Sequence, residues 1–462
     1  MIRYILKSIT VLLTLPFIAS CDFEDKNINP NNSGTIEPGP LLTYTQLNTS
    51  SEGLAKRTQV GYCMMMVQQT ASLDLNEMAG DKYLETETLG IYFTHMYSTL
   101  IKNIQELINL VENDEKMANT YAVALIWRSF LFHRITDLYG NVPYSEAGNG
   151  YRTQNFYPKY DNQSDIYAGM VNDIEKALLL LSDSKEPIVK GDILYYGDID
   201  KWKRFGNSLL LRLGMRMENV DITTAKALIA RAVQGGVMQS VDDICMVQHV
   251  EGKAATENPL GYVFNSHGLL GSGAIKISKT FMEQLKRTND PRMQVYCALP
   301  NGNIDRDKQK GLINGYDVLT ISEGDPTYTR LSDYSTFNPA TLLQLDAPTI
   351  YMTHAEIELL QAEAVVKGYI TGDAKTHYES AVYSSMKQQA VYGDAGIIPE
   401  AEIEEYLAQN LFDQARTTDE KLNVIGTEFW VSTFLNGYES YANWRRSGYP
   451  KLTPTNFPSS PN

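Results

Sequence analysis

The chain has 462 residues, and its 55 acidic side chains outnumber its 40 basic ones, giving a net charge of −15 at neutral pH. This excess of negative charge disfavours nucleic acid as a partner, because binding to phosphates requires clustered lysines and arginines. It equally disfavours adsorption to anionic lipid through a polybasic patch.

Residues 1–20 have the pattern of a secretory signal peptide. Arg3 and Lys7 precede a mostly apolar stretch, 9–18, that is too short to span a bilayer comfortably. The stretch ends in Ala19-Ser20-Cys21. Small residues before a single cysteine resemble the bacterial lipobox, in which that cysteine is acylated and becomes the mature N-terminus. We therefore expect a lipid anchor on Cys21, with an ordinary signal peptide and a chance cysteine as the alternative.

The residues after Cys21 indicate where the anchor would place the protein. Asp22, Glu24 and Asp25 follow at once, and acidic residues there resemble the export signal of surface lipoproteins in the Bacteroidetes. Removal of residues 1–20 leaves 38 basic against 55 acidic residues, a charge of −17. The expected location is the outer membrane, with the protein lipid-anchored and facing the cell exterior.

The mature chain is expected to be a short tether followed by one domain. Residues 21–40 are rich in Asn, Pro, Gly, Ser and Thr, which favours a flexible tether. No second apolar run reaches transmembrane length, so 41–462 is expected to form a domain that does not span a membrane.

Apolar residues at spacings of three and four predict a mostly helical domain. In the stretch 164–183, for example, Ile166, Met170, Ile174 and Ala177 fall on one face. In the stretch 200–217, Arg212 and Arg216 lie on another face, where they are expected to be solvated or paired with acids. The predicted helices cover 51–72, 88–113, 117–139, 164–183, 200–217, 222–235, 278–287, 352–368, 372–391, 400–414 and 418–436.

Two of these helices have the small–large–small spacing of the second helix in a tetratricopeptide unit. The matching positions are Ala225, Ile229, Ala232 and Ala374, Tyr378, Ala381, with Met170, Ile174, Ala177 as a weaker third. Small residues let two helices approach closely, and the large residue fills the space between them. Each match follows another predicted helix after what is expected to be a short turn. Tetratricopeptide-like helices are thus expected at about 88–235 and 352–391.

The loop-rich regions, about 72–100 and 237–350, are the expected ligand-binding region, because long irregular segments in compact domains are usually functional or disordered. The chain has 29 tyrosines against 14 phenylalanines. A tyrosine combines an apolar face, which can stack on a sugar, with a polar tip. The candidate ligand-binding residues are Tyr83, Tyr92, Tyr262, Tyr316 and Tyr328, with Asn265 and Asp81 as polar partners. The alternative for each ring is packing in the core.

The cysteines and histidines predict neither a disulfide framework nor a metal site. Cys63, Cys245 and Cys297 are far apart in the sequence and are expected to be buried free thiols rather than to include one long-range disulfide. The six histidines show no metal spacing, and no cofactor is expected. Short β-structure is expected near 275–277.

An ordered set of short motifs resembles the SusD/RagB family of outer-membrane nutrient-binding lipoproteins, in its SusD-like branch. The motifs are Asn29-Pro30-Asn31, Tyr139-Gly140-Asn141-Val142-Pro143-Tyr144-Ser145-Glu146-Ala147, Tyr160-Asp161, Tyr195-Tyr196-Gly197-Asp198, Lys201-Trp202, Asp290-Pro291-Arg292, Ala362-Glu363-Ala364, Trp444-Arg445-Arg446 and Gly448-Tyr449-Pro450. The resemblance covers the chain from Cys21 almost to its C-terminus. The order of the motifs, rather than any single one, carries it.

The resemblance implies tetratricopeptide-like helices that support an irregular, loop-rich ligand-binding half with little β-structure. It implies a non-enzymatic protein that binds oligosaccharides and delivers them to a SusC-like TonB-dependent transporter. Peptide capture, as in RagB-like members, is the alternative. A glycoside hydrolase is a further one, because two of the 55 acids could form a catalytic pair. The last alternative is a scaffold that binds only protein.

Three of the motifs are expected to stabilise the fold rather than to contact ligand. Val142-Pro143-Tyr144 has the pattern of a turn that leaves a helix, because residues before proline avoid the helical region. Asp290-Pro291-Arg292 is expected to be a turn or helix end with a local ion pair. Trp444-Arg445-Arg446 is expected to form a cation–π or salt-bridge cluster.

Overall fold

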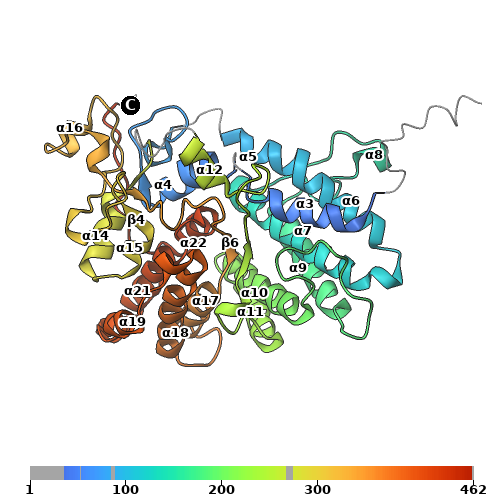
Figure 1. Cartoon of the computed structure of the whole chain (residues 1–462). Helices are drawn as coiled ribbons and strands as arrows, with labels where there is room; N and C mark the ends of the chain where they lie inside the picture. The colour runs from blue at the N-terminus through green and yellow to red at the C-terminus, as the bar shows by residue number, and fades with distance from the viewer. Residues whose placement is uncertain (1–35, 52–53, 85–88, 267–273, 460–462) are drawn as a thin grey trace, which may run out of the picture. The chain divides into compact units, whose positions relative to one another are not determined.

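Helices make up most of the regular structure in this computed structural model, which describes residues 36–51, 54–84, 89–266 and 274–459 (Figure 1). The predicted signal peptide, Cys21 and most of the predicted tether lie outside the described residues. The chain divides into Met1–Pro38 and Gly39–Asn462, and every feature described below belongs to the second unit unless its bounds say otherwise. The prediction of a mostly α fold is confirmed.

The elements up to residue 266 are mainly helices. They are α3 (Pro38–Asn48), η2 (Leu54–Cys63), α4 (Met64–Met66), β1 (Thr70–Ala71), η3 (Gly80–Lys82), α5 (Leu89–His95), η4 (Met96–Ile101), α6 (Lys102–Val111), η5 (Glu115–Met117), α7 (Ala118–Tyr139), α8 (Gly150–Thr153), α9 (Gln163–Leu180), α10 (Ile199–Met217), α11 (Ile222–Gly235), η6 (Val241–Asp243), β2 (Cys245–Val247) and α12 (Pro259–Ser266). Of these, η2 and η4 are π-helices, and the other η elements are 3₁₀-helices.

The elements from residue 274 onward begin with short strands and end in a helical bundle. They are β3 (Lys276–Ile277), α14 (Lys279–Arg287), α15 (Arg292–Tyr296), β4 (Cys297–Ala298), η7 (Arg306–Lys308), α16 (Ile321–Gly324), η8 (Leu331–Asp333), β5 (Thr336–Phe337), β6 (Thr349–Met352), α17 (His354–Val366), α18 (Ala374–Lys387), η9 (Gln388–Tyr392), η10 (Asp394–Gly396), α19 (Glu400–Leu407), α20 (Leu411–Gln414), α21 (Thr418–Ser432) and α22 (Gly437–Ser447).

Side-chain caps set the starts of the long helices. Asp198 accepts a hydrogen bond from the Lys201 amide at 2.9 Å at the start of α10, and Asp221 accepts one from the Thr224 amide at 3.0 Å at the start of α11. Thr417 and Glu420 form a reciprocal capping box on α21. These caps satisfy amides that would otherwise have no partner at the helix ends.

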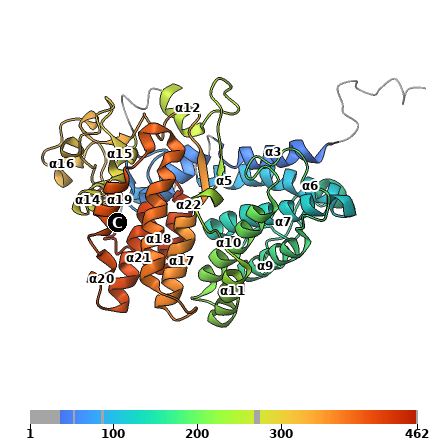
Figure 2. The same cartoon turned by 60° about the horizontal axis from the view of Figure 1, so that its bottom comes forward.

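Three helix pairs, α7 with α9, α10 with α11, and α17 with α18, pack side by side (Figures 1 and 2). Glycine permits one close crossing, because a Cβ at Gly214 in α10 would come within 2.9 Å of the Ile229 Cγ1 in α11. The predicted Ala225, Ile229 and Ala232 are buried at this contact. A short turn joins α10 to α11, as predicted, but the long segment 140–162 precedes α9, so the expected short turn is wrong there.

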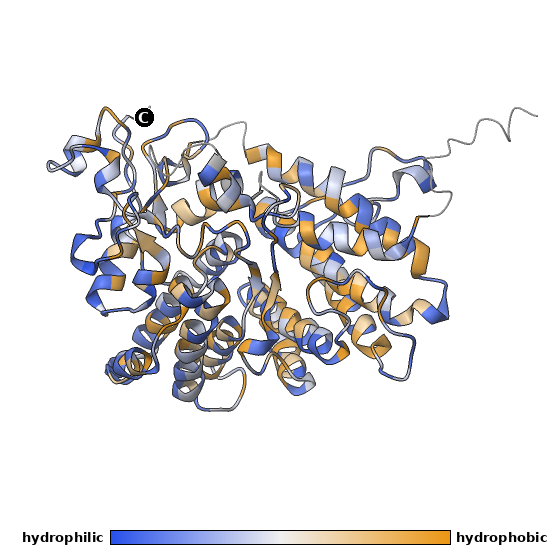
Figure 3. Ribbon diagram, viewed as in Figure 1, coloured by the Kyte–Doolittle hydropathy of each residue, from blue (hydrophilic) through white to orange (hydrophobic). Residues whose placement is uncertain are grey.

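The principal core follows these helices, and Figure 3 shows many hydrophobic residues along α7, α9 and α10. Within it, the rings of Trp127 and Phe130 stack at 4.6 Å, and Tyr351 packs against both. The three body cysteines are buried and free, as predicted. Burial raises the pKa of the Cys63 thiol to about 12.

The β-structure of the described residues consists of three two-stranded antiparallel ladders: β1 with β3, β2 with β6, and β4 with β5. The first confirms the short β-structure expected near 275–277, since Thr70 pairs with Ile277 and Ala71 with Lys276. The β1–β3 ladder joins an N-terminal segment to the loop-rich region by backbone hydrogen bonds, whereas the other two ladders pair segments that both lie between residues 245 and 352.

Several predicted boundaries are wrong. The stretch predicted as one helix over 51–72 is a π-helix followed by one short helix, and 400–414 splits into α19 and α20. The helices α3, α12 and α22 were not predicted. The predicted tether ends too late, because α3 begins at Pro38, and proline is compatible with the first helical turn.

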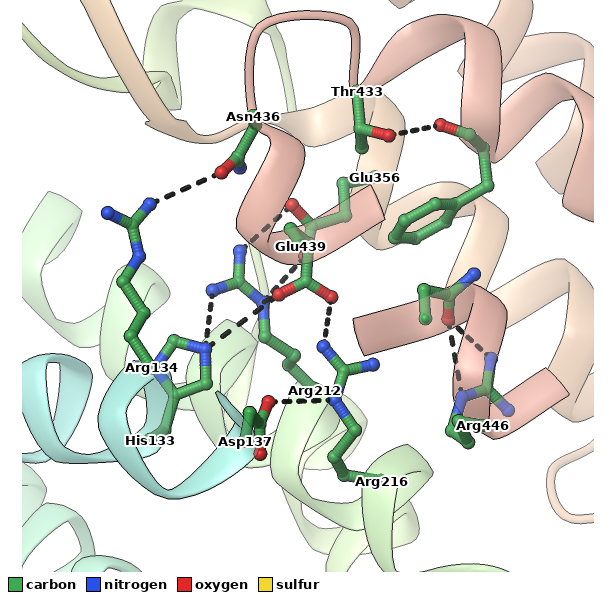
Figure 4. A network of polar contacts seen from close by, with 12 residues as sticks. His133, Arg134, Asp137, Arg212, Arg216, Glu356, Thr433, Asn436, Glu439 and Arg446 are labelled. Carbon is green, nitrogen blue, oxygen red and sulfur yellow. Dashed lines mark hydrogen bonds and ion pairs between the residues drawn. The ribbon is translucent and has the colours of Figure 1, made fainter. Parts of the chain in front are cut away.

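A buried network of charges joins α7, α10, α17 and α22 (Figure 4). Arg212 donates two hydrogen bonds to Glu356, from Nε at 2.7 Å and from Nη2 at 2.9 Å. Arg216 donates to Asp137 from Nε at 3.1 Å and also pairs with Glu439. Of the two alternatives for these arginines, pairing with acids is therefore the correct one. Removing one partner would leave another charge buried and unpaired, so the network fixes how the four helices meet.

The three motifs expected to stabilise the fold do so. Val142 pairs with Asp161 in an isolated bridge just after α7 ends. Arg292 pairs with Asp290 at 2.6 Å and also with Glu428 of α21. Arg446 pairs with Glu363 at 2.6 Å, and the Arg445 guanidinium lies 5.0 Å from the centre of the Tyr441 ring.

Candidate ligand-binding site

Predicted site residues from two loops lie around a small second core in the loop-rich region. Tyr316 and Tyr328 are partly buried against this core, which consists of Ala71, Leu73, Leu312, Ile321 and Tyr334. Each ring therefore keeps one part fixed by apolar contacts and another part accessible, as a stacking platform requires.

Polar contacts hold the Tyr328 platform in place. The Tyr328 ring stacks on Tyr334 with the ring centroids 5.9 Å apart. The Tyr334 hydroxyl donates to Asp325 at 2.5 Å, and the Lys310 ammonium lies 4.3 Å from the centre of the Tyr334 ring. Burial raises the pKa of Asp325, but hydrogen bonds from Thr327, Tyr334 and Lys310 lower it more, so the net shift is well downward. Asp325 therefore stays ionised and keeps its hydrogen bonds across the neutral range.

The prediction that Asp81 is a polar partner for ligand is wrong, because its side chain is buried. It pairs with Lys82 at 2.8 Å and accepts hydrogen bonds at 3.3 Å from the Asn314 side chain and the Gly315 amide. Burial raises the pKa of its carboxyl group despite the neighbouring ammonium. Asp81 instead ties η3 to the loop that carries Tyr316.

Tyr83 is well placed to meet a ligand, since 53% of the residue is exposed. Its backbone is in the left-handed region, with φ of 55°, directly after the buried Asp81 and Lys82. Tyr83 thus follows directly on the segment that Asp81 ties to Asn314 and Gly315. The structure thus brings Tyr83 and Tyr316 into one neighbourhood through the contacts of Asp81.

The prediction that Tyr92 stacks on ligand is wrong, because only 1% of the residue is exposed. Its ring packs 4.9 Å from that of Tyr438 and 6.3 Å from that of Tyr139. The residue lies on α5, whose position against η2 buries it. Tyr92 is therefore a core residue.

Tyr262 and Asn265 lie on a different element, α12, and both are exposed. The Asn265 amide donates to the Leu343 carbonyl at 3.3 Å. A Cβ at Gly261 would lie 2.7 Å from that same carbonyl oxygen, so α12 rests directly on the backbone of 343–344. Beside α12 is a hollow of about 630 Å³, including space open to solvent, lined in part by Asn258, Tyr351 and Tyr392.

Exposed aromatic residues outside the predicted region were missed. Tyr151, Phe156, Tyr157 and Tyr160 are all exposed, and they fall in one segment between α7 and α9. The sequence signal is present, because four aromatic residues stand there within ten positions among polar ones. They went unpredicted because the ligand-binding region was placed only at about 72–100 and 237–350.

The acids of the central network are poorly suited to hydrolysis. Glu356 and Glu439 are fully buried and paired with arginines (Figure 4). Burial raises the pKa of Glu439, but the charges of Arg212 and Arg216 lower it more, whereas burial raises the pKa of Glu356 despite the charge of Arg212. Both carboxyl groups are buried among the four helices, so a sugar cannot reach this pair in the structure. Among the described residues, no cluster of His, Cys, Asp and Glu side chains has the geometry of a metal site, and no helix could cross a membrane.

Comparisons with known proteins identify relatives of the whole chain. The family model of SusD-like proteins, described as starch-binding and associating with the outer membrane, matches residues 30–462. A chitin-binding protein of known structure is 30% identical, with a TM-score of 0.78, over 90% of this chain and 88% of that one.

Two further structures share the fold. A Bacteroidetes SusD-like protein is 25% identical with a TM-score of 0.78, over 92% of this chain and 91% of that one. A SusD homolog from Bacteroides fragilis is 24% identical with a TM-score of 0.73, over 90% of this chain and 88% of that one. No curated protein matches the chain in sequence.

Proposed function

Because the chain belongs to the SusD-like family of starch-binding, outer-membrane-associated proteins, we propose that it binds oligosaccharides at the cell surface and delivers them to a SusC-like TonB-dependent transporter. The match of the family model across residues 30–462 carries this proposal, since those residues include every predicted ligand-binding position. The lipid anchor on Cys21 and the orientation toward the cell exterior are part of the same proposal.

The proposed binding residues are the rings that keep an accessible part, namely Tyr83, Tyr262, Tyr316 and Tyr328, together with the Asn265 amide. Stacking of one ring on a flat ligand contributes about 1–3 kcal/mol in nucleic-acid sites, and sugars are expected at the low end. Two or three rings with a few hydrogen bonds give a Kd between about 1 μM and 1 mM. Weak binding suits a protein that must release its cargo to a transporter.

The charge of the chain and the name of one similar structure both support a neutral glycan. The mature charge of −17 repels acidic ligands and leaves neutral sugars unaffected. The 30% identical structure is titled a chitin-binding protein, which makes chitin oligosaccharides the first ligands to test. Starch oligosaccharides come second, on the family description.

Calorimetric titration tests the proposal with chitin oligosaccharides, maltooligosaccharides and a mixture of peptides. We expect one glycan class to bind, with Tyr83→Ala and Tyr328→Ala each weakening binding severalfold. Tyr383→Ala is the matched control, because Tyr383 is an exposed tyrosine on α18, away from the loop-rich region. If peptides bind and no glycan does, the protein captures peptides rather than oligosaccharides, and the proposal is wrong.

A further inference from the structure

The segment 151–160, here called the 151–160 platform, presents aromatic rings to solvent from the short helix α8 and the irregular loop that follows it. Of the nine exposed aromatic residues among those described, four are in this segment: Tyr151, Phe156, Tyr157 and Tyr160. Tyr157 is 92% exposed. Isolated exposed apolar residues are ordinary, but a cluster of this kind usually marks an interaction surface.

Hydrogen bonds to the side chain of Glu146 fix the shape of the platform. Glu146 accepts hydrogen bonds from the Asn155 side chain at 2.9 Å and from the Lys159 amide at 3.2 Å. Asn155 in turn accepts one from the Tyr157 amide at 3.0 Å. One carboxylate thus holds both sides of the turn that carries Phe156 and Tyr157.

The two ends of the platform are anchored to separate segments, the first to α6 and the second to the loop that follows α7. At the first end, Arg152 donates to the Asn109 carbonyl of α6 at 3.2 Å, and the Lys102 ammonium lies 5.8 Å from the centre of the Tyr151 ring. At the second end, Asp161 accepts hydrogen bonds from the Ser145 amide at 2.8 Å and the Tyr144 amide at 3.0 Å. These hydrogen bonds lower the pKa of Asp161 although burial opposes them, so the anchor persists under mildly acidic conditions.

The backbone of the platform turns so that its rings meet at an angle. Gln154 is in the left-handed region, with φ of 55°, and its side chain donates to the Tyr151 carbonyl at 2.9 Å. The Tyr151 and Phe156 rings consequently meet edge to face, with their centroids 6.2 Å apart. Rings held in this way lose little conformational freedom on binding, which favours affinity for a weak ligand.

The chemistry between the rings favours carbohydrate over a protein surface. Arg152, Gln154 and Lys159 are exposed and alternate in the sequence with the aromatic positions, so the platform carries hydrogen-bonding groups as well as rings. Pyranose rings have an apolar C–H face surrounded by hydroxyl groups and match this alternation. The apolar centre of a protein interface, in contrast, is depleted of charged side chains.

We propose that the 151–160 platform is a second carbohydrate-binding surface, which stacks on pyranose rings of a long glycan chain. This inference rests on the proposed function and extends it. The loop-rich site binds one stretch of the chain, and the platform binds another stretch. The second contact is then intramolecular, so long chains bind more tightly than short ones.

Affinity electrophoresis through gels that contain glycol chitin or soluble starch tests the platform. The platform variant is Tyr157→Ala/Tyr160→Ala, and the matched control is Tyr196→Ala/Tyr383→Ala, which also removes two exposed tyrosines. We expect retardation of the platform variant by the polymer to weaken at least about fivefold, while that of the control stays unchanged. Calorimetric affinity for a short oligosaccharide is expected to be the same in both.

The outcomes separate this inference from the proposed function. If the wild-type protein is retarded and the platform variant is retarded equally, the second surface does not exist and the capture function stands. If the wild-type protein is retarded by neither polymer and binds no short glycan, both proposals are wrong. The unfolding temperature of each variant is also measured. If it equals that of the wild-type protein, a lost contact rather than a lost fold explains the result.

Discussion

The buried carboxylate of Glu363 provides a quantitative test of how the helices are held together. Arg446 donates to it at 2.6 Å and 2.7 Å, and Lys367 donates at 2.6 Å. Burial raises the pKa of Glu363, but the charge of Arg446 outweighs that effect and the net pKa falls from 4.5 to about 2. A pKa lowered by this amount corresponds to about 3 kcal/mol of stability in the ionised state.

The sign of the pH dependence follows from the direction of the shift. Because the pKa is lower in the folded state, the unfolded chain takes up the proton first as the pH falls. The contribution is therefore complete above about pH 5 and disappears as the pH falls from about 5 to about 2. The variant Glu363→Gln, which cannot ionise, should lose about 3 kcal/mol at pH 7 and progressively less below pH 4.5.

Urea unfolding followed by circular dichroism at pH 7, 5 and 3 measures this difference. Glu404→Gln is the matched control, because Glu404 is exposed on α19 and its substitution should change stability by less than about 0.5 kcal/mol. A loss below about 1 kcal/mol for Glu363→Gln at pH 7, or an equal loss at pH 7 and pH 3, would refute the reasoning.

Four further predictions follow from packing and from the sequence. Gly214→Ala should cost about 1–3 kcal/mol in urea unfolding, because its new Cβ would come within 2.9 Å of Ile229; a neutral effect would mean that α11 can move aside. Tyr92→Ala should cost about 3–5 kcal/mol of stability, and a loss of glycan affinity at unchanged stability would show that Tyr92 contacts ligand after all. Iodoacetamide at pH 8 should leave native Cys63 unmodified in mass spectra, since burial raises its pKa to about 12; rapid labelling without urea would contradict this. Cys21→Ser should release the mature protein from membranes on fractionation, and retention in the membrane fraction would contradict the proposed lipid anchor on Cys21.

The helices were predictable because their evidence is local. In α9, Ile166, Met170, Ile174 and Ala177 repeat at the helical period, and the structure buries all four. Boundaries failed where local signals were ambiguous. Pro38 and Pro40 suggested a loop, although proline is tolerated in a first helical turn, and nothing local distinguishes the π-helix η2 from an α-helix.

The binding residues were harder to predict, because exposure depends on contacts between distant segments. Tyr83 and Tyr92 both lie beside loops in the sequence, yet Tyr83 is exposed while Tyr438 helps to bury Tyr92. Asp81 is buried because Asn314 and Gly315 fold against it from a position far along the chain. Only the tertiary structure decides which of two similar tyrosines can meet a ligand.

Titration of the wild-type protein with chitohexaose, followed by chromatography of the recovered sugar, tests the central claim most directly. Our account predicts saturable binding with a Kd between about 1 μM and 1 mM, and chitohexaose or, failing it, maltohexaose recovered intact. Shorter sugars in the recovered material would show that the protein is a hydrolase. Absence of binding by both hexasaccharides at millimolar concentration would contradict glycan capture.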